Sequence, residues 1–176
     1  MKKLLLAGLA LVLTLAPVPS IGDHRQLATE AVVRAEHCTA RVVTGDDHDG
    51  TESYYQPMIH TLYIGTSDST PPMVSLLILL HEIGHCHQYQ EMTVPVQVAL
   101  YPTAPSKELD ADMRSGRMAC ELGIDGHTEI RKLFAWAKET FGYEGDSNHG
   151  TAAERIAAFD AGCDAARHKT TDIQGA

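Results

Sequence analysis

The chain has 176 residues, with 14 lysines and arginines against 23 aspartates and glutamates, and its formal net charge is −9. This length favours a single domain. The basic residues form no cluster, which argues against nucleic acid as a partner, and the acidity most simply serves solubility.

The first twenty residues are typical of a secretory signal peptide. Lys2 and Lys3 form a basic start, residues 4–16 form an apolar segment, and small residues precede a cleavage position after Ser20. We therefore expect residues 1–20 to be a signal peptide and residues 21–176 to form one secreted or periplasmic domain. If the segment were not cut, residues 4–16 would anchor the chain in a membrane, although they are short for a bilayer span.

The cysteines fit an oxidising compartment. An even number of them predicts two disulfides, and the sequence does not choose among the three possible pairings of Cys38, Cys86, Cys120 and Cys163. No two of them have the spacing of a metal-binding Cys-x-x-Cys pair. Cys86 would point about 100° around a helix from its neighbour His85, so we interpret Cys86 as structural.

The periodicity of the apolar residues predicts an α+β fold that is mostly helical with a small sheet. Helices are expected over residues 21–45, 74–91, 106–122 and 128–141, and in a last segment that starts at Thr151. Short strands rich in tyrosine and apolar residues are expected at residues 53–56 and 58–64.

The remaining segments are expected to be irregular. They are the proline-containing stretch at residues 93–105, a polar loop at residues 142–150 and a frayed tail at residues 168–176. Thr151 and Glu154 have the spacing of a capping box, which predicts that the last helix begins there.

One pentapeptide carries most of the functional information. An apolar run at residues 74–80 leads directly into His81-Glu82-Ile83-Gly84-His85, which has the pattern His-Glu-x-x-His. Residues i and i+4 of a helix share a face, so His81 and His85 can bind one metal ion, with Glu82 as general base on a metal-bound water. Zn²⁺ is the expected metal because imidazole and carboxylate ligands suit it. The alternative is a chance match on a buried helix with two core histidines.

A catalytic zinc site needs a third protein ligand, and the next predicted helix offers carboxylates. Glu108 and Asp112 are spaced i,i+4 and share a face, whereas Asp110 points elsewhere. We predict that Glu108 is the third ligand and that Asp112 accepts a hydrogen bond from a ligand imidazole. The alternative is an exposed acidic helix start, which the helix dipole favours.

The order of three motifs resembles that of the neutral zinc metallopeptidases. The motifs are His81-Glu82-Ile83-Gly84-His85, Glu108-Leu109-Asp110-Ala111-Asp112 and His149-Gly150-Thr151-Ala152-Ala153-Glu154-Arg155, and Gln88 is also similar to that family. More loosely, the order resembles the gluzincins related to HtpX and the CAAX-prenyl endopeptidases. The resemblance spans residues 54–164. The chain differs from the family in lacking transmembrane helices and in having a short segment before the first motif.

This resemblance implies a zincin-like fold and further site residues. His149 would donate a hydrogen bond to the oxyanion of the tetrahedral intermediate, and Arg155 would pair with an acidic group, which we expect to be Asp112. In this architecture an extended peptide docks on the edge strand before the motif helix through main-chain hydrogen bonds. That strand would contribute His60, Leu62 and Ile64.

These observations predict a secreted zinc-dependent metalloendopeptidase, a hydrolase in which Glu82 is the general base. We expect Zn²⁺ as cofactor, a protein or peptide as substrate, and no stable membrane insertion after signal cleavage. Two alternatives stay open: a zinc-dependent amidase acting on cell-wall peptide cross-links, and a catalytically silent zinc-binding module that recognises a partner. Glu82 argues against the silent module, because zinc binding does not require it. The sequence does not predict an oligomeric state.

Overall fold

The structure is a computed structural model that describes residue 29 and residues 31–44, 53–65 and 70–174. The expected signal peptide at residues 1–20, with its apolar segment at residues 4–16, lies outside the described residues. Within the described ranges, no helix is both long and apolar enough to cross a membrane.

The described part of the chain is mostly helical and has a small mixed sheet, which agrees with the α+β expectation. The helices are α2 (Pro72–Glu91), α3 (Val94–Leu100), α4 (Ala104–Glu121), α5 (Gly126–Phe141) and α6 (Ala152–Gln174). The remaining elements are β1 (Arg41–Thr44), β2 (Tyr54–Gln56), the 3-10 turn η1 (Pro57–Ile59), β3 (Thr61–Ile64), β4 (Gly145–Asp146) and β5 (Gly150–Thr151).

Strand β3 lies at the centre of the three-stranded sheet. The strand order is β1-β3-β2, with β1 parallel and β2 antiparallel to β3. Leu62 and Ile64 of β3 are buried, and His60 precedes the strand in the left-handed conformation, with φ 48°. The prediction that His60, Leu62 and Ile64 form a peptide-binding edge is therefore wrong, because β3 is paired on both sides. The edges of the described sheet are β1 and β2.

Other segments also differ from the sequence prediction. Residues 31–35 are helical, but the helix expected over residues 21–45 has given way to strand β1 by Arg41. The segment 93–105, expected to be irregular, contains α3. The polar loop at residues 142–150 contains β4, which pairs with β5, and α6 continues to Gln174 where a frayed tail was expected.

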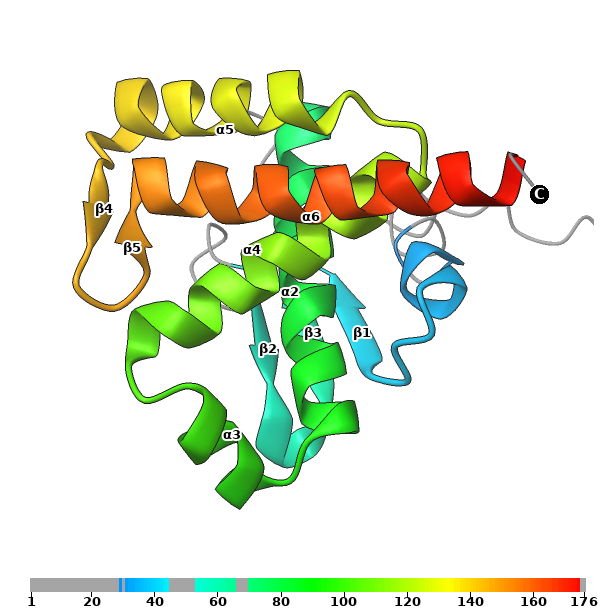
Figure 1. Ribbon diagram of the computed structural model, residues 1–176. Coiled ribbons are helices and arrows are strands. Elements are labelled where there is room, and N and C mark those ends of the chain that lie inside the picture. Colours follow the sequence, from blue (N-terminus) through cyan, green and yellow to red (C-terminus); the bar gives the residue numbers. More distant parts are fainter. Residues whose placement is uncertain (1–28, 30, 45–52, 66–69, 175–176) are drawn as a thin grey trace, which may run out of the picture.

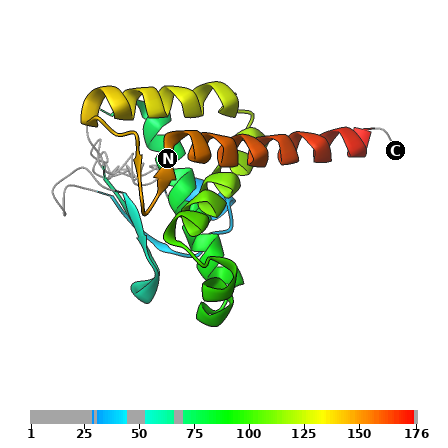
Figure 2. The ribbon, with the colours of Figure 1, turned by 60° about the vertical axis from the view of Figure 1, so that its left-hand side comes forward.

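The helices are stacked on the sheet in a defined order (Figure 1). Helix α2 packs against β2 and β3, and α4 also packs against α2. Helix α6 packs along α4 and also contacts α5. Helices α5 and α6 lie side by side in both ribbon views (Figures 1 and 2). The helix that carries His81 and His85 is thus contacted by both the sheet and α4.

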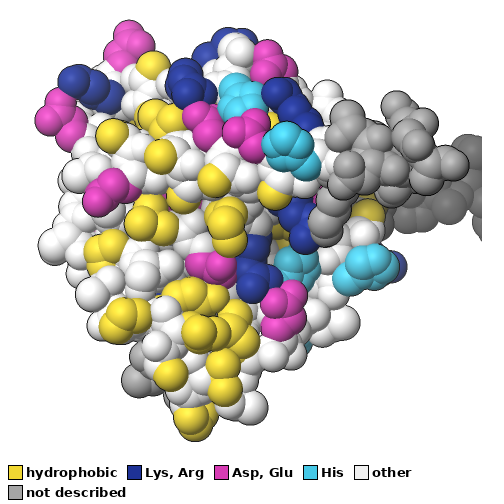
Figure 3. Space-filling model, viewed as in Figure 1, with side chains coloured by type: hydrophobic (Ala, Val, Ile, Leu, Met, Phe, Trp, Pro, Cys, Tyr) yellow, Lys and Arg dark blue, Asp and Glu magenta, His cyan; other side chains and the backbone are white. Residues whose placement is uncertain are grey.

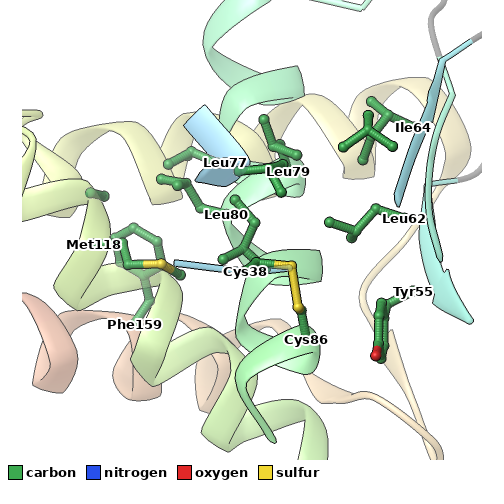
Figure 4. Packing of buried hydrophobic residues seen from close by; sticks show 14 of the residues in the cluster. Cys38, Tyr55, Leu62, Ile64, Leu77, Leu79, Leu80, Cys86, Met118 and Phe159 are labelled. Carbon is green, nitrogen blue, oxygen red and sulfur yellow. A yellow bond between two sulfur atoms is a disulfide. The ribbon is translucent and has the colours of Figure 1, made fainter. Parts of the chain in front are cut away.

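The apolar core surrounds α2 (Figure 4). Leu80 and Ile83 of α2 and Leu62 of β3 are fully buried. Phe159 of α6 is 1 % exposed. Both faces of α2 are therefore covered, one by the sheet and another by the helices. A helix surrounded in this way holds its polar side chains in fixed positions, because close-packed interiors leave few alternative rotamers.

The cysteines form two disulfides, Cys38–Cys86 and Cys120–Cys163, which selects one of the three pairings that the sequence left open. The first joins α2 to the chain before β1, as Figure 4 shows, and the second joins α4 to α6. Cys86 is thereby structural, as expected. Two disulfides fit an extracellular protein.

Proline and capping residues set the starts of the helices. Pro72 occupies the first position of α2, where its missing N–H costs nothing. Thr103 and Ser106 form a capping box at the start of α4. The expected capping box before α6 is also formed: the backbone N–H of Glu154 donates to the Thr151 hydroxyl at 3.2 Å, and that of Thr151 donates to the Glu154 carboxylate at 2.8 Å.

One end of the molecule carries exposed apolar side chains. Val96 and Leu100 on α3 are exposed, as are Met58 and Ile59 in the 3-10 turn between β2 and β3. Figure 3 shows hydrophobic side chains gathered over the lower part of one face, where α3 lies in Figure 1. None of these four side chains lines the cavity described below.

Candidate metal centre

The two histidines of the pentapeptide lie on one face of α2. His81 and His85 are one turn apart, and their ring centroids are 4.7 Å from each other. The side chain of His81 is 12 % exposed and that of His85 is 11 % exposed. Two largely buried imidazoles side by side need polar partners, because an unpaired buried polar group is costly.

Helix α4 brings a carboxylate to both imidazoles. Oε2 of Glu108 lies 3.1 Å from Nε2 of His81 and 3.2 Å from Nε2 of His85. Among the described residues, His81, His85 and Glu108 form the group whose potential ligand atoms all lie within 4.8 Å of one another. These three side chains, which the sequence predicted as ligands, could therefore hold one metal ion.

The opposite nitrogen of each ring is occupied by a hydrogen-bond acceptor. Nδ1 of His81 is 2.8 Å from Oδ1 of Asp112, and Nδ1 of His85 is 2.9 Å from Oε1 of Gln88. Because a carboxylate oxygen only accepts, the Nδ1–H of His81 must be the donor, and the amide oxygen of Gln88 likewise accepts from His85. The Nε2 atom of each neutral ring is then left with a lone pair directed toward Glu108.

This arrangement fits a metal ion chemically. Two nitrogen lone pairs and a carboxylate oxygen repel one another unless a cation, whether a proton or a metal ion, lies among them. Ligand atoms placed tetrahedrally around zinc, with bonds of about 2.0–2.1 Å, are about 3.3 Å apart. The observed separations of 3.1 and 3.2 Å are close to that value.

The charges at the centre shift the pKa values of its members. Burial opposes the protonated form of His81, but the Asp112 carboxylate and Glu108 outweigh it and raise the pKa of His81 to about 10. Burial opposes the ionised form of Glu108, but hydrogen bonds from His81 and His85 hold its pKa well below the usual range. The centre is thus anionic enough to attract a cation.

Asp112 is itself held by an arginine from α6. Nε of Arg155 donates to Oδ2 of Asp112 at 2.7 Å, and a terminal nitrogen of Arg155 donates to Oδ1 at 2.9 Å. The expected pairing of Arg155 with Asp112 is therefore formed, in the two-pronged geometry that fixes a carboxylate most firmly. Phe134 of α5 lies against the guanidinium, with its ring centroid 5.4 Å from Cζ of Arg155. Tyr143 stacks on Phe134.

Glu82 is buried next to the predicted ligands. Glu82 is only 6 % exposed, and this burial raises the pKa of its carboxyl group. The backbone N–H of Tyr55 in β2 donates a hydrogen bond to this carboxylate. A buried carboxylate with a raised pKa, held beside a candidate metal position, has the properties that a general base would need.

The centre opens into a cavity of about 540 Å³. Glu82 and the three potential ligands line it, together with Asp112 and Arg155. His149 lines the same cavity, but its side chain is half exposed, and both its backbone N–H and Nδ1 contact Asp146. The structure thus brings His149 to the cavity, whereas His60, Leu62 and Ile64 lie elsewhere.

Sequence reasoning did not predict the role of two supports of this centre, although it noted Gln88 for its similarity to the family. Gln88 is the partner of His85, and it in turn donates to Asp110 at 2.9 Å and to the carbonyl of Lys107. Its position three residues after His85, on the same helix face, is the signal that could have identified it. The Tyr55 backbone contact comes from strand β2, and no local pattern indicates which backbone amide will face Glu82.

Comparisons of the chain with family models, with curated proteins and with solved structures found no match. The resemblance of the three motifs to the neutral zinc metallopeptidases therefore stays an expectation from the sequence.

Proposed function

We propose that the protein is a secreted zinc-dependent metalloendopeptidase with a zincin-like fold. The observation that carries the proposal is the convergence of His81, His85 and Glu108 on one position, beside the buried carboxylate of Glu82 and open to a cavity. A binding module would need the three ligands but not Glu82. A cavity of about 540 Å³ is within the usual size range of ligand sites.

Zinc held by the three ligands would polarise the scissile carbonyl and lower the pKa of a water molecule that it binds. The role of Glu82 is to take the proton from the attacking water and to pass it to the leaving amine. The raised pKa of Glu82, caused by its burial, suits this role, because a carboxylate with a raised pKa holds a proton more strongly than an exposed one. Asp112 and Gln88 would keep the two imidazoles in the tautomer that binds metal.

The substrate is proposed to dock along β2 instead of β3. Ser53, Tyr54 and Tyr55 line the cavity, and β2 is an edge of the described sheet. The N–H of Tyr55 points to Glu82, so the unpaired side of this strand faces the general base. An extended peptide could add to such an edge through main-chain hydrogen bonds, which would place one of its carbonyl groups at the metal.

Glu82→Gln tests the reaction. Glutamine keeps the shape of the side chain but cannot take a proton, so we expect zinc content to be retained and turnover to fall roughly 10²–10⁴-fold. Zinc stoichiometry and hydrolysis of a degenerate peptide library are measured on the same preparations. Glu139→Gln, which changes an exposed glutamate of α5, is the matched control.

The outcomes separate the proposed function from its alternatives. Full turnover in Glu82→Gln would remove Glu82 from the mechanism. Zinc binding without hydrolysis of the peptide library or of casein, but with release of fragments from purified cell wall, would favour the amidase. Zinc binding without hydrolysis of any of these would favour the silent module.

A further inference from the structure

A lysine lines the cavity beside the candidate metal centre and has no role in the proposed reaction. Lys107 precedes Glu108 on α4 and is half buried. Its Nζ atom donates a hydrogen bond to the hydroxyl of Tyr89 at 2.9 Å and lies 4.4 Å from the centroid of that ring. Tyr89 also lines the cavity and is half buried. The tyrosine therefore holds the ammonium group at the cavity wall.

This ammonium group has no carboxylate partner within the part of the chain that the structure describes. Arg114 and Arg117, the other basic residues of α4, each pair with a carboxylate. Arg155, which lines the same cavity, pairs with Asp112. Burial removes part of the hydration of a charged group, so an anion that enters the cavity would supply the interaction that Lys107 lacks.

The side chains of Lys107 and Tyr89 offer donors that match a carboxylate. An ammonium group has three N–H donors, and the hydroxyl of Tyr89 accepts one of them, which leaves two. The hydroxyl can still donate its own hydrogen. The oxygens of a carboxylate only accept, so these donors can bind both oxygens of one carboxylate group. Hydrogen bonds to ionised groups are about twice as strong as those between neutral groups.

The two side chains lie close enough to the metal position to contact a bound substrate. Tyr89 follows His85 by one helical turn, about 6 Å along the axis of α2. The ring of Tyr55, in the strand along which the substrate is proposed to dock, has its centroid 5.4 Å from that of Tyr89. An extended peptide advances about 3.3 Å per residue, so a carboxylate one or two residues from the scissile bond would reach Lys107.

We propose that Lys107 and Tyr89 form a binding site for a carboxylate of the substrate, one or two residues from the scissile bond. The carboxylate belongs either to an acidic side chain or to the carboxyl terminus of a short peptide. This inference rests on the proposed function, because it names the substrate group that the peptidase recognises. Hydrogen bonds to a charged group favour the carboxylate over the matching amide by about 10- to 100-fold in affinity.

The test uses phosphinic peptides, in which a zinc-binding phosphinate replaces the scissile bond and two residues extend on each side. The uncharged compounds have glutamine at these positions and blocked ends. The charged compounds carry one glutamate in place of a glutamine, or a free carboxyl end, and each is compared with the uncharged compound of the same length. Calorimetry measures binding to the zinc-loaded protein. At least one charged compound should bind about 10- to 100-fold more tightly than its uncharged match, and which one does so identifies the acidic side chain or the terminus as the ligand.

Substitutions separate the charge from the hydroxyl. Lys107→Met keeps the length of the side chain but removes its charge, so the ratio of affinities should fall toward one, whereas Lys107→Arg should keep part of it. Tyr89→Phe keeps the ring and should lower the ratio, which tests the site even if Lys107→Met fails to fold. Lys132→Met, at an exposed lysine of α5 that pairs with Glu129, is the matched control and should keep the full ratio. Circular dichroism and thermal unfolding establish that the variants are folded.

The carboxylate site and the proposed function can fail separately. An unmodified protein that binds no charged compound more tightly than its uncharged match would overturn the site even if peptides are cleaved. Folded Lys107→Met and Tyr89→Phe variants that keep the full ratio would overturn it as well. A preference that Lys107→Met abolishes, in a protein that cleaves no peptide, would support the site and overturn the peptidase. Binding of none of the compounds would overturn both.

Discussion

The two imidazoles of the candidate centre are held by acceptors of different charge. His81 donates to Asp112, an anion that Arg155 neutralises from α6. His85 donates to Gln88, a neutral amide that is anchored on Asp110 of α4. A charged acceptor strengthens a hydrogen bond to imidazole about twofold relative to a neutral one. His81 should therefore depend more on its partner than His85 does.

The contacts predict an order of damage to zinc affinity for three alanine variants of α4. Glu108→Ala leaves two ligands and should lose most of the metal, and Asp112→Ala should weaken binding about 10–100-fold. Asp110→Ala should have the smallest effect, because Asp110 acts on His85 only through Gln88. Competition with a chelator measures all three. Release of the metal by Asp110→Ala, with retention by Glu108→Ala, would show that the ligand assignment is wrong.

Zinc binding should release a proton from His81. With no metal bound, the pKa of His81 is raised to about 10, so the ring is protonated at neutral pH and must lose that proton to bind zinc. The apparent affinity should therefore rise with pH, by up to about tenfold per unit, until about pH 10. Calorimetry in two buffers with different heats of ionisation counts the protons.

The control for proton release is Asp112→Asn, which removes the carboxylate nearest to His81. This change lowers the pKa of His81 and should make the affinity less dependent on pH. Equal heats in both buffers for the unmodified protein would show that His81 is already neutral.

At the level of single residues, the helical period was sufficient to predict much of the candidate site. The i,i+4 spacing of His81 with His85, and of Glu108 with Asp112, places each pair on one face. The structure brings these four side chains together. Gln88 was noted only for its similarity to the family, and its role as the partner of His85 was not predicted, because the sequence does not show which group an uncharged glutamine will contact.

At the level of elements, the distance between α2 and α4 depends on one glycine inside the pentapeptide. A Cβ atom on Gly84 would lie 2.8 Å from the backbone oxygen of Ala111 in α4, which is closer than real Cβ contacts allow. Gly84 lies between His81 and His85, and Ala111 lies between Glu108 and Asp112. The same close approach therefore sets how far Glu108 reaches toward the imidazoles.

Gly84→Ala should weaken zinc binding and reduce stability. Alanine favours a helix by about 1 kcal/mol relative to glycine, so helix propensity alone predicts that this variant is more stable. The clash with Ala111 should outweigh that gain, since overpacking costs about 1–3 kcal/mol. Urea unfolding with the metal chelated, and zinc affinity by chelator competition, measure the two effects. A more stable variant with unchanged zinc affinity would contradict the argument.

The sequence prediction failed for two different physical reasons, one for the helices and one for the sheet. Pro95 and Pro105 argued against helix, yet each stands in the first turn of its helix, where proline needs no hydrogen-bond partner. Strand β1 pairs in parallel with β3 across about twenty residues of chain, and that pairing is what makes β3 central. Pairing between distant segments leaves no local pattern, so the docking edge could not be identified from the sequence.

At the level of the whole molecule, the elements that carry the predicted ligands are each cross-linked to another element. Cys86 on α2 is bonded to Cys38, and Cys120 on α4 is bonded to Cys163 on α6. Both ligand helices are therefore fixed covalently, in addition to their packing. The two closed loops, residues 38–86 and 120–163, do not overlap in the sequence, so each should restrict the unfolded chain independently.

Removing the two disulfides should lower the free energy of unfolding by additive amounts. Their sequence separations are 48 and 43 residues, and loops of this size are worth about 4 kcal/mol each in the chain-entropy account. We compare the double variants Cys38→Ala/Cys86→Ala and Cys120→Ala/Cys163→Ala with the quadruple variant by urea unfolding, with zinc chelated so that metal loss does not contribute.

Intact-mass analysis after alkylation first establishes that the unmodified protein has no reactive thiol before reduction. Four alkylatable thiols at that stage would refute the pairing. If the quadruple variant loses no more stability than the more damaged double variant, the two loops stabilise one shared region and the assumption of independence is wrong.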